Sequence, residues 1–289
     1  MQWPISASAT LLGACLLFTA AVPATATPWF EDVTGSTGIA PLRHGEGVNA
    51  VDLNCDDRPD LYLPSVREPG RLLLNQGDGT FLDATARAGT NAQGGVGAAI
   101  GDLNGDGRPD IYVARGADPY VAPNVVYLQQ ADGTFQDAST RAGLGDKSNG
   151  LTVTLADFTG DGAPDAFLPG WGGDSLFRND GSAHFTEVST PAGMARSGRG
   201  WIAVVADFDS DWKLDIFATH GSPTALRDNR LYRNRGGGSF ADVTIAAGLA
   251  ASPWSMGAVA SDFDGDGNVD LYVAGYYGPG RLYRNDGRM

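Results

Sequence analysis

The fold class that the sequence predicts is all-β, and three observations carry this prediction. A nine-residue pattern with Asp at positions 1, 5 and 9 occurs five times, at intervals of 50, 55, 50 and 55 residues. A second pattern, in which a Gly-rich tip precedes Phe and an acidic residue two positions later, keeps the same interval. Apolar runs between turn residues indicate four short strands in each repeat. We therefore predict a β-propeller of five four-stranded blades.

The second repeat illustrates the order of the predicted elements. Its strands are expected at 96–102, 110–114, 124–129 and 134–138, and Asp132-Gly133 predicts a tight hairpin between the last two. The first strand of each repeat holds small and apolar residues, as in GAAIG and GAVAS. Small side chains suit the innermost strands of a radial array, because these strands crowd together. A β-sandwich or an open solenoid is the alternative.

The two ends of the repeat array complement each other. The last repeat stops after the third-strand sequence RLYRNDG at 281–287, and a matching Phe strand lies at Phe30–Thr34. We therefore expect the amino-terminal strand to close the last blade, which would leave no open sheet edge. A truncated larger propeller is the alternative.

Residues 1–26 have the pattern of a signal peptide, although they lack the usual basic residue. They carry no charge, Leu11–Val22 is too short an apolar run to span a bilayer, and Ala24-Thr25-Ala26 fits a cleavage site. We expect residues 27–289 to form the propeller in a secreted, periplasmic or extracellular protein without a transmembrane segment. A lipid anchor at Cys15 is the alternative, because Leu12-Gly13-Ala14-Cys15 resembles a lipobox.

The composition excludes several classes of protein. The chain has 34 acidic residues against 20 Lys and Arg, a net charge of −14, whereas a nucleic-acid partner requires a basic stripe. With 42% hydrophobic residues the chain can build a core, so disorder is not expected. Cys15 and Cys55 are too few for a disulfide scaffold. The sequence does not indicate an oligomeric state.

The Asp loops have the pattern of calcium sites. Alternate side chains of a tight loop converge on one point, and carboxylates that close repel one another unless a cation lies between them. Ca²⁺ prefers such oxygen ligands, and an EF-hand is excluded because position 12 is apolar in all five loops. We predict up to five Ca²⁺ ions, with metal-free turns as the alternative. The side-chain ligands would be Asp52, Asn54, Asp56 and Asp60; Asp102, Asn104, Asp106 and Asp110; Asp157, Thr159, Asp161 and Asp165; Asp207, Asp209, Asp211 and Asp215; and Asp262, Asp264, Asp266 and Asp270.

The five loops are not equivalent. The loops that begin at Asp102 and Asp262 are expected to bind most securely, because each combines Gly at position 6 with a strong ligand at position 3. Trp212 occupies position 6 of the fourth loop and should strain a left-handed turn. Together the predicted ligand positions hold 17 of the 34 acidic residues, so five Ca²⁺ would change the net charge from −14 to −4.

The complete repeat resembles a known family. The phrase DxNxDGxxD-[LI]-Y, followed by LYxN-x-G-x-GxF and by D-[VA]-T-x-x-AG, resembles the FG-GAP/VCBS repeat and is most similar to the cartilage acidic protein-like (ASPIC/UnbV) family. This resemblance covers residues 29–287. It implies a propeller, calcium loops and a role in extracellular adhesion or ligand binding. The chain departs from the family in its small number of blades and in lacking the ASPIC/UnbV segment.

The connections opposite the Asp loops are the predicted ligand-binding face. They vary in length and sequence between repeats, and exposed aromatic side chains there would suit protein or glycan recognition. The alternative is that these aromatic residues pack between blades. The candidate residues are Tyr120, Trp171, His220, Trp254, Tyr276 and Tyr277.

Support for an enzyme is weak in the sequence. The three histidines fall in different repeats, and G-x-S-x-G and HExxH motifs are absent, so no catalytic residue is predicted. We expect an exported, calcium-binding propeller that acts as a binding or adhesion module for an extracellular protein or glycan. The alternative is a propeller lectin or a polysaccharide-processing enzyme that uses the aromatic face.

Overall fold

The computed structural model divides the chain into two compact units, Met1–Val33 and Thr34–Met289. The expected signal peptide and Cys15 lie outside the described residues. The structure describes residues 30–40, 42, 45, 47–116, 122–144, 150–194, 198–221, 229–250, 254–276 and 278–288.

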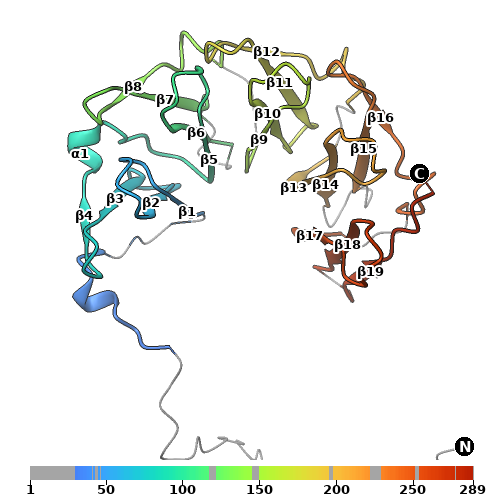
Figure 1. Ribbon diagram of the computed structural model, residues 1–289, viewed down its shortest axis with the longest axis horizontal. Coiled ribbons are helices and arrows are strands. Elements are labelled where there is room, and N and C mark those ends of the chain that lie inside the picture. Colours follow the sequence, from blue (N-terminus) through green and yellow to red (C-terminus); the bar gives the residue numbers. More distant parts are fainter. Residues whose placement is uncertain are drawn as a thin grey trace, which may run out of the picture. The chain divides into compact units, whose positions relative to one another are not determined.

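The described residues of the second unit form five antiparallel sheets, which we call blades one to five, and they follow one another along the chain (Figure 1). Blade one contains β1 (Asn49–Val51), β2 (Asp60–Leu63), β3 (Arg71–Asn75) and β4 (Phe81–Asp83), and blade two contains β5 (Gly97–Gly101), β6 (Asp110–Ala114), β7 (Val125–Gln129) and β8 (Phe135–Asp137). Blade three contains β9 (Thr154–Ala156), β10 (Asp165–Leu168), β11 (Ser175–Asn179) and β12 (Phe185–Glu187), and blade four contains β13 (Gly200–Ala206), β14 (Asp215–His220), β15 (Arg230–Asn234) and β16 (Phe240–Asp242). Blade five contains β17 (Gly257–Ser261), β18 (Asp270–Ala274) and β19 (Arg281–Tyr283).

The strands of every blade lie in chain order, so each pairs with the next through a hairpin. The four strands expected in the second repeat are confirmed within one or two residues at each end. The described helical structure is short and consists of the 3₁₀ turn η1 (Thr34–Ser36) and the helix α1 (Thr85–Ala88). The all-β propeller prediction is therefore confirmed, with blades one to four complete.

Small residues in the first strands allow neighbouring blades to approach closely. The strands β1 and β5, β5 and β9, and β13 and β17 are in contact. A Cβ atom added to Gly97 would lie 3.0 Å from the Leu151 carbonyl oxygen and 3.1 Å from Thr152 Cα, in the segment before β9. A larger side chain at this position would push the two backbones apart, as the GAAIG pattern predicts.

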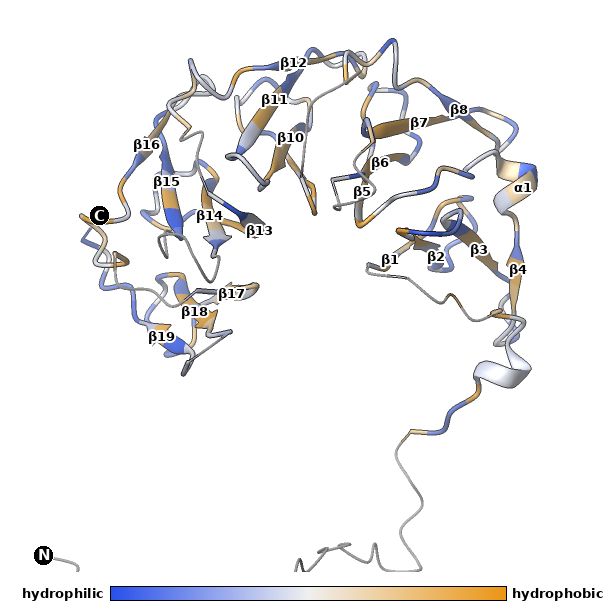
Figure 2. Ribbon diagram, turned by 180° about the vertical axis from the view of Figure 1, so that it is seen from behind, coloured by the Kyte–Doolittle hydropathy of each residue, from blue (hydrophilic) through white to orange (hydrophobic). Residues whose placement is uncertain are grey.

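The hydrophobic cores lie between neighbouring blades. One core joins Leu103 and Val126 of blade two to Phe177 and Phe185 of blade three, and equivalent cores lie at the other three junctions. The hydrophobic colouring of β7 and β10 in Figure 2 follows from this two-sided packing, because middle strands contact a core on each face. The packing of each blade against its neighbours consequently contributes to its stability.

An amide side chain at the end of the third strand joins each of blades two to five to the preceding blade. Asn179 donates through Nδ2 to the carbonyl oxygen of Leu103, at position 2 of the preceding Asp loop, over 2.9 Å. In blade one, Asn75 has the same place but donates to the Pro59 carbonyl oxygen of its own blade, over 3.1 Å. The remaining pairs of this kind are Gln129 with Leu53, Asn234 with Phe158 and Asn285 with Phe208.

Blade five has no fourth strand among the described residues, and the face that it turns away from blade four is more exposed than the equivalent faces of the other blades. Its sheet has three strands, and Thr34 begins η1, so closure by residues 30–34 remains a prediction. Phe263 is 48% exposed and Tyr272 is 41% exposed, whereas the equivalent Leu103 and Tyr112 are fully buried. No further sheet covers this face of blade five in the part of the chain that the structure describes.

We expect Asn179→Ala to lower the free energy of unfolding by about 0.5–1.5 kcal/mol more than Asn75→Ala, because only the first removes a hydrogen bond to another blade, whose Leu103 carbonyl oxygen keeps the Ala183 amide as its other donor. The two asparagines share their other bonds, since each also donates to a proline carbonyl of its own blade and accepts from a Gly amide. Urea unfolding followed by tryptophan fluorescence measures the difference. Equal losses for the two variants would contradict the role of this amide between blades.

Candidate metal-binding loops and the opposite loop face

Each Asp loop connects the first and second strands of a blade and ends on a buried carboxylate. Asp110 at position 9 is fully buried at the start of β6. Its Oδ2 accepts from the Leu103 amide over 3.0 Å, and its Oδ1 accepts from the Gln129 amide over 2.8 Å. This carboxylate therefore fixes the loop to the third strand. The same pair of bonds is made by Asp60, Asp165, Asp215 and Asp270.

The carboxylate at position 1 organises the exposed part of the loop. Asp262 accepts from the amides of Gly265, Asp266 and Gly267 over 2.7, 3.2 and 2.9 Å. Gly265 has a φ of 78° and Gly267 a φ of 90°, so the chain turns through the left-handed region at positions 4 and 6. The turn at position 6 was predicted, whereas position 4 was missed despite its Gly in three of five loops.

The two loops without Gly at positions 4 and 6 adopt the same backbone. Cys55 and Asp57 in the first loop, and Ser210 and Trp212 in the fourth, have φ between 59° and 66°. Trp212 is 95% exposed, so its side chain adds strain without any packing that would offset it. The left-handed turn at Trp212 agrees with the prediction for this loop.

Three carboxylates converge in each of the two loops that have Asp at position 3. Positions 1, 3 and 9 offer oxygens that lie within 4.8 Å of one another. The carboxylate at position 5 lies outside these groups, and in the fifth loop Asp266 Oδ1 accepts from the Asn268 amide over 2.8 Å. The other three loops have Asn or Thr at position 3 and thus fewer carboxylates. The convergent groups are Asp207, Asp209 and Asp215, and Asp262, Asp264 and Asp270.

Basic side chains distinguish the loops further. In the fourth loop Lys213 Nζ lies 2.8 Å from Asp211 Oδ2, and Arg233 pairs with Asp209. Loops one to three each hold one Arg against the position-5 Asp, namely Arg58, Arg108 and Arg178. In the fifth loop no basic side chain among the described residues pairs with any of the four carboxylates. The second loop, which was expected to bind as securely as the fifth, thus differs from it in holding a cation that sequence patterns did not indicate.

Burial makes negative charge costly at position 9. It raises the pKa of Asp110 to about 6, and the neighbouring carboxylates of Asp106 and Asp102 add to this effect. Burial likewise raises the pKa of Asp215 to about 6. At position 1, by contrast, hydrogen bonds led by the Gly267 amide lower the pKa of Asp262. A nearby cation would favour the ionised form of each of these carboxylates.

The side-chain atoms that could coordinate a metal in these loops suit a hard divalent cation. They are oxygens of carboxylates, amides or a hydroxyl, without the sulfur or imidazole that softer metals prefer. The fifth loop combines four carboxylates, a convergent group of three and the left-handed turns that glycine accommodates. Its residues Asp262, Asp264 and Asp270 form the strongest candidate metal site among the described loops.

The opposite ends of the blades carry the aromatic residues that were predicted to contact ligand. The Arg199 guanidinium lies 4.6 Å from the centre of the Trp171 ring, and Trp254 lies 4.8 Å from Tyr276. Tyr276 is 52% exposed, whereas Trp254 is 9% exposed. The predicted residues Tyr120 and Tyr277 lie outside the described residues. An apolar cluster of Val66, Val96 and Leu151 with Trp171 joins connections of blades one to three, and Trp201 of β13 packs against it.

His220 belongs to a buried network rather than to the exposed aromatic set. It is 1% exposed, its Nε2 lies 2.9 Å from Asp174 Oδ1, and its Nδ1 lies 3.1 Å from the Ala218 carbonyl oxygen. The Tyr232 hydroxyl donates to Asp174 Oδ2 over 2.9 Å. His220 therefore ties blade four to blade three. Asp174 could not be identified from sequence patterns, because its partners His220 and Tyr232 are 46 and 58 residues away.

Comparison with known proteins identifies the repeat. The FG-GAP-like repeat profile matches residues 52–113, 116–168, 157–218 and 207–273. Over 265 residues the chain is 28% identical to cartilage acidic protein 1 of Homo sapiens, in an alignment that covers 84% of this chain and 40% of that protein. The chain thus spans about two fifths of the length of the curated relatives that it matches.

Two solved structures align with most of the chain. One is a lectin from Agrocybe aegerita that recognises non-reducing terminal N-acetylglucosamine. Its alignment includes 85% of this chain and 64% of the lectin chain, with 19% identity and a TM-score of 0.49. The other is the rhamnogalacturonan lyase YesW, whose alignment includes 84% of this chain and 56% of the lyase chain, with 14% identity and a TM-score of 0.42. Among the described residues, no helix is long and apolar enough to cross a membrane.

Proposed function

We propose, from the premise that this chain belongs to the FG-GAP-like repeat family, that it is an exported, calcium-stabilised β-propeller that binds an extracellular protein or glycan. The observation that carries the calcium part of this proposal is the fifth loop. Three of its carboxylates converge within 4.8 Å, and no basic side chain among the described residues neutralises them. Uncompensated carboxylates at this spacing repel one another, whereas a divalent cation would turn the repulsion into attraction.

Calcium would act on the blade rather than on a reaction. Asp262 and Asp264 belong to the exposed loop and Asp270 begins β18, so an ion held by all three would fix the β17–β18 hairpin. Asp270 also accepts from the Asn285 amide, and Asn285 donates to the Phe208 carbonyl oxygen of blade four. The ion would therefore stabilise the junction between blades as well as the loop.

The loop face opposite the Asp loops supports a role in binding. It presents Trp171 beside Arg199 and Tyr276 beside Trp254, and flat aromatic rings next to hydrogen-bonding groups suit sugars and protein side chains. The Asp loops repeat closely while these connections differ from blade to blade. Such a division leaves one end of the fold to stability and the other to recognition. A lectin or polysaccharide-processing enzyme that uses this face is the alternative.

Calcium should raise the melting temperature, because it binds the folded loops more tightly than the unfolded chain. A site held at a hundred times its Kd would contribute about 2.7 kcal/mol, or roughly 5–10 °C for a chain of this size. Replacing Asp262 and Asp264 together by Asn should remove the contribution of the fifth loop. Calorimetry in calcium and in EDTA measures both effects.

Asp286→Asn is the matched control for this experiment, because Asp286 precedes Gly287, which lies beside Asn268 of the fifth loop, and is not a predicted ligand. Its calcium response should equal that of the parent protein. Identical melting temperatures in calcium and in EDTA would mean that the five loops are metal-free turns.

Ligand binding should depend on the aromatic loop face. We expect Trp171→Ala and Tyr276→Ala each to weaken binding of a protein or glycan at least tenfold, because central aromatic side chains supply much of the free energy of recognition. Glycan arrays and matrix-protein binding assays provide the measurement. Trp212→Ala is the control, since this exposed Trp lies on a metal loop at the other end of the fold.

These assays also separate binding from catalysis. Loss of binding in the Trp212 variant, with Trp171 and Tyr276 variants unaffected, would place recognition at the Asp loops instead. Turnover of a polysaccharide that disappears when an Asp or Glu outside the metal loops is replaced would favour the enzyme.

Export is proposed from residues 1–26 alone. If a signal peptidase acts after Ala26, mass spectrometry of the mature protein should find Thr27 as its first residue. A mature protein that begins at a lipid-modified Cys15 would instead identify a membrane-anchored form. An intact Met1 in protein from the natural host would contradict both forms of export.

A further inference from the structure

The fourth and fifth Asp loops have the same four carboxylates, at positions 1, 3, 5 and 9. In both loops the carboxylates at positions 1, 3 and 9 converge within 4.8 Å. Their surroundings differ, because a guanidinium and an ammonium group lie against the carboxylates of the fourth loop. The two loops therefore show one acidic arrangement with and without side-chain cations.

The Arg233 guanidinium pairs with the carboxylate at position 3 of the fourth loop. Its Nε contacts Asp209 Oδ2, and its Nη2 lies 3.7 Å from Asp211 Oδ2. The Asp209 side chain is 1% exposed, so this contact excludes water from the carboxylate. Ca²⁺ coordinates oxygen atoms at about 2.3–2.6 Å, but one of the two oxygens at position 3 already has a cation beside it.

Lys213 pairs with the carboxylate at position 5. Its Nζ lies 2.8 Å from Asp211 Oδ2, and its amide donates to Asp211 Oδ1 over 3.0 Å. Together with Arg233, it places two positive charges among four carboxylates and leaves a local charge of −2. One Ca²⁺ ion among the four carboxylates of the fifth loop would leave the same local charge.

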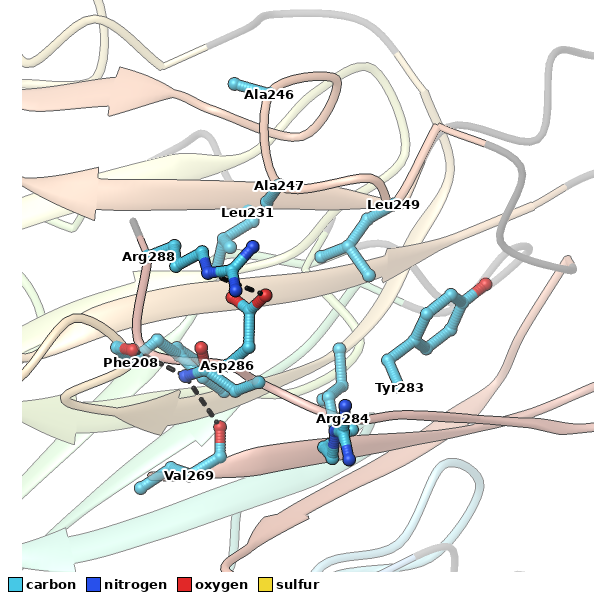
Figure 3. Close-up of a pocket in the computed structure, with 12 residues that line it drawn as sticks. Phe208, Leu231, Ala246, Ala247, Leu249, Val269, Tyr283, Arg284, Asp286 and Arg288 are labelled. Atoms are coloured by element: carbon cyan, nitrogen blue, oxygen red, sulfur yellow. Dashed lines mark hydrogen bonds and ion pairs between the residues drawn. The ribbon is translucent and has the colours of Figure 1, made fainter. Parts of the chain in front are cut away.

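Blade five has an arginine in the place of Arg233, but this arginine does not reach its loop. Arg233 and Arg284 each directly precede the asparagine whose amide donates to the position-9 carboxylate. Arg284 lines the hollow of about 220 Å³ between blades four and five, which Figure 3 shows, and pairs with no carboxylate in the described part of the chain. Position 7 of the fifth loop is Asn268 instead of lysine. The cation pairs are therefore specific to the fourth loop.

The backbone of the fourth loop also needs support from its side chains. Ser210 and Trp212 hold left-handed turns at positions 4 and 6, where the fifth loop has glycine. These turns are strained for residues other than glycine. Arg233 of β15 connects positions 3 and 5 to the third strand, which is the kind of support that an ion would give to the fifth loop.

We propose that the fourth Asp loop does not bind Ca²⁺, because Arg233 and Lys213 supply the positive charge that an ion would supply in the fifth loop. A divalent ion would have to displace the guanidinium from Asp209 and would be repelled by both side chains. The fourth loop is then stable without calcium, and the chain binds at most four ions. This inference rests on the proposed binding of Ca²⁺ by the fifth loop, which is its reference.

The number of bound ions tests the proposal. Equilibrium dialysis of the full-length, EDTA-treated protein, at a free Ca²⁺ concentration that saturates the fifth loop, gives this number. Arg233→Gln combined with Lys213→Gln should raise it by one ion per chain, and addition of Asp209→Asn should remove that ion. Arg284→Gln is the matched control and should leave the number unchanged, because no loop carboxylate pairs with this arginine in the described part of the chain.

Terbium tests the fourth loop without any change to its cations. Tb³⁺ is a hard cation that occupies oxygen sites for Ca²⁺, and it emits light when a tryptophan close to it is excited. Trp212 belongs to the fourth loop, and the other four Asp loops contain no tryptophan. In the parent protein, Trp212→Phe should therefore leave the tryptophan-excited emission of Tb³⁺ unchanged. The variant without Arg233 and Lys213 should emit more strongly, and Trp212→Phe should remove this increase.

Thermal unfolding in EDTA compares the two loops in the absence of metal. Asp209→Asn should lower the melting temperature by roughly 3–10 °C, because it removes the charged partner of Arg233. Asp264→Asn should not lower it, because this change relieves repulsion among carboxylates that have no basic partner among the described residues. Equal losses for the two variants would show that Arg233 does not stabilise the fourth loop and would overturn the proposal.

Two further results would overturn it. One is the loss of a bound ion, or of Tb³⁺ emission, when Asp209→Asn or Trp212→Phe is introduced into the parent protein. The other is an unchanged number of ions in the variant without Arg233 and Lys213, once circular dichroism shows that this variant is folded. If it does not fold, the terbium experiment on the parent protein decides. Failure of the proposed function differs, because Asp264→Asn would then leave the number of ions unchanged.

Discussion

The buried carboxylate at position 9 of each Asp loop is the constraint on which the rest of this structure depends. Asp110 accepts one amide from its own loop and one from the end of the third strand, and its counterparts do the same. These bonds hold the Asp loop, the start of the second strand and the end of the third strand of a blade together. The residue that donates from the third strand also reaches back through its side chain to the preceding loop. Loop geometry and the junction between blades are therefore set by one connected group of atoms.

This connection explains why acidic loops can matter to a fold that has no continuous core. Each core lies between two blades, so the stability of one sheet depends on how its neighbour is held. In loops one to four, basic side chains reduce the repulsion among the carboxylates, and in the fourth loop two of them act together. The fifth loop has four carboxylates and no such partner among the described residues. A divalent cation would have its largest effect there, at the blade whose sheet has three strands.

The two ends of the blades carry different chemistry. At one end, five similar loops present oxygen donors and tightly specified backbone turns. At the other, connections of differing sequence place Trp171 against Arg199 and Trp254 against Tyr276. The His220–Asp174 contact beneath this second end joins blades three and four without presenting a side chain to solvent. The fold can thus vary its recognition face while the bonds that join the blades stay the same.

The sequence by itself determined the number of blades, the strands of each repeat, the Asp loops and the left-handed turn at position 6. These features follow from local spacing and turn chemistry, which a regular repeat displays five times over. Only the tertiary structure decided which carboxylates converge, which loops hold an Arg or Lys, and that His220 is buried against Asp174. It also revealed a largely apolar hollow at the junction of blades four and five. The carboxylates and their basic partners are brought together by the turns and hairpins of a single blade, which composition and spacing do not specify. The His220–Asp174 contact and the hollow instead depend on the packing of one sheet against the next.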